Sequence, residues 1–145
     1  MTDEIKEKFT GKWKMDRSEN FDGFMNAMGV NFFIRKMAGL AKPENEIKVE
    51  DDGTIVIATN STFMKSEQRF KLDEEYVEEN PMIKKKFKNM PTFKDGKLRV
   101  TPTPAEQVDV PYPDYAEREI TEEGEMLLSI KVGDTVCKRW FKRVE

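Results

Sequence analysis

The sequence predicts an all-β protein: an antiparallel β-barrel with a pair of short helices inserted after the first strand. From residue 46 onward, short strand-like runs alternate with Gly-containing turn sequences, a pattern typical of an antiparallel meander. Helical periodicity is clear only in residues 21–42. Apolar and charged residues each make up 37% of the chain. This composition suits a barrel whose interior is only partly filled by side chains.

The first strand is predicted from alternating apolar and polar residues around Trp13 and Met15, beginning at Phe9. Two helices then follow with almost nothing between them. Gly29 is placed to end the first, Asn31 can cap the second, and Pro43 ends it. The apolar residues that share a helix face are Phe21, Phe24, Met25 and Met28 in the first helix, and Phe33, Met37 and Leu40 in the second.

Turn sequences define the remaining hairpins. They lie at residues 51–53, 94–97, 122–125 and 132–135. The basic run 84–86 is interpreted as a solvated strand edge, with contact to an anionic membrane as the alternative. The proline-rich residues 101–115 predict an ordered excursion or edge segment, because proline cannot donate to a β-ladder. We expect this segment to fold over Trp140.

Composition argues against several classes of function. The chain of 145 residues fits one domain, 1–145, and a net charge of -3 gives no support for nucleic-acid binding. It has no histidine and one cysteine, Cys137, which removes most nucleophile pairs and zinc sites. We therefore expect no catalysis, no cofactor and no metal. The lone cysteine and the absence of an apolar leader or span predict a cytoplasmic protein.

Side-chain alternation turns two arginines toward the barrel interior. Arg118 shares a strand face with Ala116 and Ile120, and Arg139 shares one with Cys137 and Phe141. An inward arginine is costly unless an anion or a hydrogen-bond network meets it. A bound carboxylate would match the guanidinium fork. The alternative is that one arginine is buried against an acidic side chain from elsewhere in the barrel.

These residues belong to a pattern that runs through nearly the whole chain. Its segments are residues 9–15, 20–25, 28–30, 34–43, 60–63, 70–76 and 135–139. In them the chain resembles the fatty-acid-binding protein family of intracellular lipid carriers. The resemblance implies a ten-stranded β-clam or barrel with a helix-turn-helix lid after the first strand, and a lipid held in an internal cavity that contains water.

The resemblance also assigns roles to individual residues. It implies that Arg118 and Arg139 hold the ligand carboxylate, together with position 141, where the family usually has tyrosine and this chain has Phe141. Retinol carriers of the family typically have glutamine at the arginine positions, so two arginines favour an acid. The implied tail and portal contacts are Phe21, Met25, Val30, Pro43 and Phe63; each has an alternative as ordinary core. The implied membrane or nuclear-import patch is Arg35, Lys36 and Lys42, with a solvated helix face as the alternative.

The expected function is reversible, stoichiometric transport of a long-chain fatty acid, with retinoic acid as the second choice of ligand. A nuclear role is the competing hypothesis: delivery of lipid to a receptor, with the protein both cytoplasmic and nuclear. Transient contact with a membrane is a further expectation. An enzyme acting on a bound lipid is the third hypothesis. We expect a monomer that binds no nucleic acid.

Overall fold

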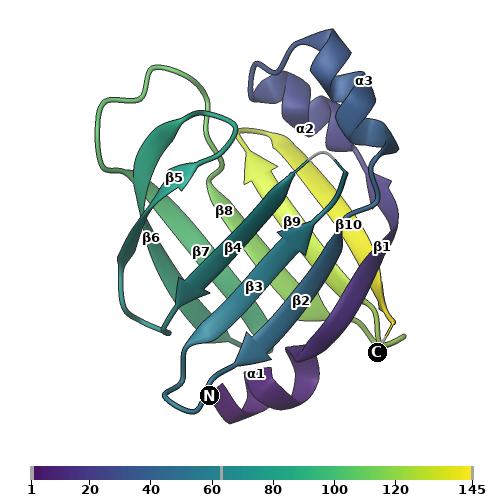
Figure 1. Ribbon diagram of the computed structural model, residues 1–145. Coiled ribbons are helices and arrows are strands. Elements are labelled where there is room, and N and C mark those ends of the chain that lie inside the picture. Colours follow the sequence, from purple (N-terminus) through teal and green to yellow (C-terminus); the bar gives the residue numbers. More distant parts are fainter. Residues whose placement is uncertain (1, 63, 145) are drawn as a thin grey trace.

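The computed structural model describes residues 2–62 and 64–144, and in it ten antiparallel strands form one sheet that closes almost into a barrel (Figure 1). The strand order is β4-β3-β2-β1-β10-β9-β8-β7-β6-β5, so β4 and β5 are the two edges. The elements are α1 (Thr2–Phe9), β1 (Gly11–Glu19), α2 (Phe21–Ala27), α3 (Phe32–Leu40), β2 (Glu44–Val49), β3 (Ile55–Asn60), β4 (Lys65–Phe70), β5 (Tyr76–Asn80), β6 (Lys85–Lys94), β7 (Lys97–Pro104), β8 (Tyr115–Ile120), β9 (Met126–Val132) and β10 (Thr135–Arg143). The predicted fold class is therefore confirmed. No helix in these residues is long and apolar enough to cross a membrane.

The predicted turns join consecutive strands in register. In the hairpin of β6 and β7, Asp95 and Gly96 have φ angles of 54° and 78°, and Lys94 pairs with Lys97. Two successive positive φ values are the geometry that an Asp-Gly pair adopts most readily in a two-residue loop. The turns at 51–53, 122–125 and 132–135 likewise join β2 to β3, β8 to β9 and β9 to β10. Local turn chemistry therefore fixes the order of most of the sheet.

Helix α1 was not predicted, and it closes the end of the barrel opposite α2 and α3 (Figure 1). Phe9 ends this helix, so the prediction that Phe9 opens the first strand is wrong; β1 begins at Gly11. Ile5 and Phe9 are completely buried, and the Phe9 ring meets Phe93 edge to face at 6.4 Å. The hydrophobic effect on these two side chains, one helical turn apart, holds α1 against the barrel.

Helices α2 and α3 form as predicted, but they bury very different amounts of apolar surface. Phe24 and Met25 of α2 are buried in a cluster with Cys137 of β10. Asn31 caps α3, because its side chain accepts a hydrogen bond of 3.0 Å from the backbone N–H of Ile34. The face that was predicted to be shared by Phe33, Met37 and Leu40 is exposed, with 71%, 50% and 86% of these residues accessible to solvent.

The proline-rich segment divides into a strand and a loop. Pro102 and Pro104 lie in β7 and face β6. They come after the residues of β7 that pair with β8, so this part of β7 has a partner strand on one side only, where proline is tolerated. Residues 105–114 are held by backbone hydrogen bonds to Lys86 and Lys131. The hypothesis that this segment folds over Trp140 is not supported: Arg17 covers that ring, with its guanidinium carbon 4.5 Å from the ring centroid.

Candidate functional site

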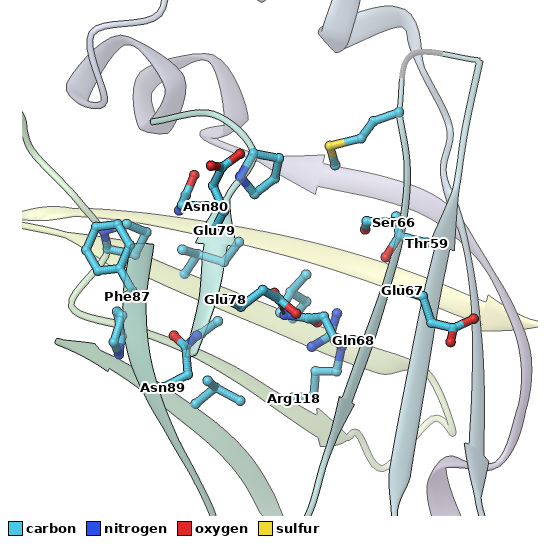
Figure 2. Close-up of a pocket in the computed structure, with 18 residues that line it drawn as sticks. Thr59, Ser66, Glu67, Gln68, Glu78, Glu79, Asn80, Phe87, Asn89 and Arg118 are labelled. Atoms are coloured by element: carbon cyan, nitrogen blue, oxygen red, sulfur yellow. Dashed lines mark hydrogen bonds between the residues drawn. The ribbon is translucent and has the colours of Figure 1, made fainter. Parts of the chain in front are cut away.

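Two adjoining cavities occupy the space between the sheet and the helix pair. The inner cavity, of about 490 Å³, lies deeper in the barrel, and its polar lining includes Gln68, Glu78, Asn89 and Arg118 (Figure 2). The portal cavity, of about 780 Å³, lies beneath α2 and α3 and is lined largely by apolar residues. Thr59, Met64 and Pro81 line both cavities. The two spaces therefore adjoin as one candidate site, with most of the charged and amide side chains in the inner cavity and mostly apolar residue types beneath the helices.

Arg118 projects from β8 into the inner cavity, as alternation predicted. Only 8% of the residue is exposed, and its Nε has no hydrogen-bond partner among the described residues. Burial lowers the pKa of its guanidinium to about 10, so the group still carries its charge at neutral pH. Within the described ranges no carboxylate forms an ion pair with it. The described residues therefore do not support the alternative that an acidic side chain of the protein neutralises Arg118.

Arg139 lies in the same row of the sheet but opens onto the other cavity. Arg118 pairs with Leu128 of β9, which in turn pairs with Arg139 of β10. Two strand spacings separate the arginine backbones by roughly 10 Å. Arg139 lines the portal cavity, with its guanidinium carbon 3.8 Å from the centroid of the Phe21 ring. Burial lowers the pKa of this guanidinium too, and its Nε has no hydrogen-bond partner in the described residues.

Phe141 does not join the arginines. It is 1% exposed and belongs to the hydrophobic core, where it pairs with Met15 of β1 and Met126 of β9. The linings of the two cavities do not include it. Position 141 therefore has no polar group to offer a head group, and its side chain closes the barrel wall below the row of the two arginines.

Sequence reasoning missed the polar residues at the gap between β4 and β5. Gln68 of β4 donates a side-chain hydrogen bond of 3.4 Å to Glu78 of β5, and Figure 2 shows both side chains in the inner cavity near Arg118. Burial raises the pKa of the Glu78 carboxyl. Tyr76 shares the inward face of β5 with Glu78, while Val77 between them is 58% exposed. A rule that apolar residues face inward would have chosen Val77. The inward side chains of β5 therefore could not be identified from hydrophobicity.

The four described residues of the expected tail site all line the portal cavity. They are Phe21, Met25, Val30 and Pro43. Phe63, the fifth, lies outside the described residues. Val110, from the loop at 105–114, also lines this cavity. The loop thus contributes to the wall of the portal, which its proline content alone did not indicate.

Of the three residues of the expected basic patch, Arg35 forms an ion pair and the two lysines are exposed. Arg35 donates hydrogen bonds to the Asp22 carboxylate at 3.0 Å and to the Val30 carbonyl at 2.8 Å, so it ties α3 to α2. Lys36 and Lys42 are exposed. They flank the exposed apolar residues of α3, so the outer face of this helix combines apolar and positively charged groups.

Cys137 gives no sign of nucleophilic chemistry. It is completely buried, and burial raises the pKa of its thiol to about 11, so the thiol stays protonated at neutral pH. In the ranges that the structure describes, no cluster of three or more His, Cys, Asp or Glu residues is arranged to hold a metal ion. The linings of the two cavities combine arginines, carboxylates, amides and apolar side chains.

Comparisons with known proteins give a consistent result. Residues 10–102 match the model of the lipocalin / cytosolic fatty-acid binding protein family. Cellular retinoic acid-binding protein 2 of Rattus norvegicus is 36% identical over 137 residues, covering 93% of this chain and 97% of that protein. Fatty acid-binding protein homolog 2 of Echinococcus granulosus is 35% identical over 137 residues, covering 94% and 98%. The crystal structure of Echinococcus granulosus fatty-acid-binding protein 1 has a TM-score of 0.82 at 32% identity, covering 96% of this chain and 99% of that chain.

Proposed function

The chain belongs to the lipocalin / cytosolic fatty-acid binding protein family, and on that premise we propose that it is a reversible carrier of long-chain fatty acids. Lipid binding is the function shared at the level of the family, which is one of carriers and not of enzymes. The proposal adds the ligand class and its orientation. The carboxylate is bound at Arg118, and the hydrocarbon tail extends through the portal cavity.

The burial of Arg118 carries this proposal. The guanidinium of a residue that is 8% exposed, with an unpaired Nε and no described carboxylate partner, is expensive in a protein interior. A ligand carboxylate would accept two charge-assisted hydrogen bonds from the fork and offset that cost. An alcohol or an ester brings no charge. The inner cavity should therefore prefer an ionised acid to a neutral lipid with the same tail.

The tail supplies most of the affinity in this account. Burying one methylene is worth about 0.8 kcal/mol, so the length of the tail dominates the binding free energy while the head group selects the class of lipid. Phe21, Met25, Val30 and Pro43 offer the apolar surface for it. Arg139 lines the portal cavity, stacked on Phe21, so a carboxylate at Arg118 in the inner cavity lies away from it.

Retinoic acid is the second candidate ligand. One relative, at 36% identity, is named a cellular retinoic acid-binding protein, and retinoic acid carries the same carboxylate on a more rigid apolar body. Two inward arginines serve either acid equally well. We place fatty acid first because the portal cavity is lined by flexible methionines, Met25, Met28 and Met64, beside its aromatic residue, and these side chains adapt to a flexible chain.

Calorimetric titration of delipidated protein tests the proposal. Oleic acid, oleyl alcohol, methyl oleate and retinoic acid are compared under the same conditions. We expect one equivalent of oleic acid to bind more than tenfold more tightly than oleyl alcohol, because charge-assisted hydrogen bonds are worth about 1.5–3 kcal/mol. Equal affinity for acid and alcohol would overturn the assignment of the carboxylate to Arg118. Tighter binding of retinoic acid than of any fatty acid would reverse the order of the two ligands.

The outer face of α3 supports a second proposal, transient contact with an anionic membrane during lipid transfer. Phe33 and Leu40 are 71% and 86% exposed; exposed Lys36 lies between them in the sequence and exposed Lys42 follows Leu40. Exposed apolar side chains beside lysines suit an anionic lipid surface. Transfer of a fluorescent fatty acid should be faster to phosphatidylserine vesicles than to phosphatidylcholine vesicles, and Lys36→Glu with Lys42→Glu should abolish the difference. An unchanged difference would exclude this surface.

Delivery of lipid to the nucleus is the competing use of the same surface. It predicts ligand-dependent nuclear accumulation of a fluorescently tagged chain that is lost when Lys36 and Lys42 are neutralised. Neutralising Arg35 is the matched control. Arg35 pairs with Asp22 and is mostly buried, so its loss should not affect a surface signal. Nuclear accumulation without any dependence on ligand or on these lysines would exclude delivery by this route.

A further inference from the structure

The loop at residues 105–114 borders both cavities. Pro113 lines the inner cavity, which also holds Arg118, and Val110 lines the portal cavity. Figure 1 shows this loop, between β7 and β8, at the same end of the barrel as α2 and α3. The loop therefore reaches from the proposed head-group site to the wall of the tail site.

Contacts with β6 anchor this loop on either side of Val110. Before it, the backbone N–H of Ala105 donates a hydrogen bond of 3.0 Å to the carbonyl of Lys86. After it, the ring of Tyr112 packs against the ring of Phe87, with centroids 5.3 Å apart, and Phe87 is 2% exposed. The position of Val110 is therefore set before a ligand binds, which lowers the conformational cost of a contact with one.

Val110 is 47% exposed although it lines a largely apolar cavity. Two other apolar residues of that cavity, Ile34 of α3 and Met82 of the turn between β5 and β6, are also partly exposed. The three come from separate segments of the chain, and together they place apolar surface at the portal in contact with water. A hydrocarbon that covers this surface gains free energy from the hydrophobic effect.

We propose that Val110 is a specificity-determining residue that contacts the distal part of the ligand tail, so that the loop at 105–114 selects long-chain over medium-chain acids. This inference rests on the proposed function, in which the carboxylate lies at Arg118 and the tail continues into the portal cavity. A long tail reaches Val110 and covers it, whereas a medium-chain tail ends before it. Neither alternation nor resemblance assigned a ligand contact to this loop.

Calorimetric titration of Val110→Ser with oleic acid and with decanoic acid tests the proposal. Decanoic acid has the same head group on a much shorter tail. Serine removes apolar contact surface, so binding of oleic acid should weaken by about fivefold and binding of decanoic acid by less than about twofold. The matched control is Val144→Ser: Val144 follows β10, is 49% exposed and lines neither cavity. It should leave both affinities unchanged.

A second readout separates a tail contact from a purely structural role. In protein labelled with ¹³C at the valine methyl groups, oleic acid should shift the resonances of Val110 and leave those of Val144 in place, and decanoic acid should shift neither. Equal weakening of both acids by Val110→Ser would overturn the inference, because a contact that serves every acid does not select for length.

Two outcomes distinguish this inference from the function on which it rests. If Val110→Ser keeps full affinity for oleic acid while Arg118→Met loses it, the inference is wrong and the proposed function stands. If the wild-type protein binds neither acid, the proposed function itself fails.

Discussion

Replacing Arg118 with methionine should change stability and affinity in opposite directions. Arg118 is 8% exposed, and burial lowers the pKa of its guanidinium well below its ordinary value, to about 10. At about 1.4 kcal/mol per pKa unit, this corresponds to roughly 3 kcal/mol against the charged form in the folded protein. The penalty applies at every pH below about 10, where the group is charged in both the folded and the unfolded chain. Methionine of similar length removes it.

The assay is urea unfolding of delipidated protein, followed by fluorescence, together with oleic acid titration. Arg118→Met should raise the free energy of unfolding by up to about 3 kcal/mol, or the melting temperature by roughly 6–12 °C. The same variant should bind oleic acid at least about tenfold more weakly, because the charge-assisted hydrogen bonds are lost. Affinity for oleyl alcohol should change little.

Arg99→Met is the matched control. Arg99 of β7 is also an inter-strand arginine, but its side chain is 43% exposed and pairs with Glu117 at 2.9 Å. Removing Arg99 leaves the Glu117 side chain, which is 11% exposed, without its partner, so it should lower the free energy of unfolding by about 1–3 kcal/mol and leave oleic acid affinity unchanged. If Arg118→Met instead unfolds more easily than the wild type, Arg118 has a counter-charge in the free protein, and the reasoning that it awaits a ligand carboxylate is refuted.

Three further predictions follow from the same structure. Arg139→Met should weaken oleic acid binding by about threefold, less than Arg118→Met, because Arg139 lines the portal cavity and not the inner cavity that holds Arg118; a larger loss in titration would make Arg139 the main anchor. Burial raises the pKa of Glu78, so the contribution of this carboxyl to stability is most favourable while it is protonated and falls as pH rises through its folded pKa. Glu78→Gln should therefore gain stability relative to wild type as pH rises from the acid range, where Glu78 is protonated, to neutral pH in urea titrations, and a constant difference would contradict this. Ile5→Ala should lower the free energy of unfolding by about 2–5 kcal/mol if α1 seals the barrel, while a change below 1 kcal/mol in chemical denaturation would show that α1 is dispensable.

Much of this fold could be predicted because its strands are joined by local turns. The pair Asp95 and Gly96 specifies a hairpin with almost no help from tertiary contacts. Alternation in β8 and β10 then placed Arg118 and Arg139 on the inner face correctly. These residues lie in strands whose opposite faces carry glutamates or lysines that need water, so the parity was unambiguous.

The errors have two physical causes. Helix α1 is eight residues long, too short for periodicity to reveal, and is stabilised mainly by burial of Ile5 and Phe9 on a barrel that the sequence does not show directly. Strand β5 was ambiguous because the barrel interior is polar at this point. There Glu78 faces inward while Val77 faces solvent, the reverse of what apolar burial predicts.

The separation of the two arginines also could not be predicted. Alternation places Arg118 and Arg139 on one face and resemblance implies one head group for both, but only the side-chain geometry shows them in different cavities. Which cavity a long side chain enters depends on its rotamer and on neighbours from distant strands. The stacking of Arg139 on Phe21, 118 positions away in the chain, is such a contact.

A crystal structure of the delipidated protein loaded with oleic acid tests the central claim most directly. The account predicts that the carboxylate lies within hydrogen-bond distance of Arg118 in the inner cavity, and that the tail passes between Phe21 and Pro43 beneath α2 and α3. The opposite orientation, with the carboxylate at the helices and the terminal methyl beside Arg118, would contradict it.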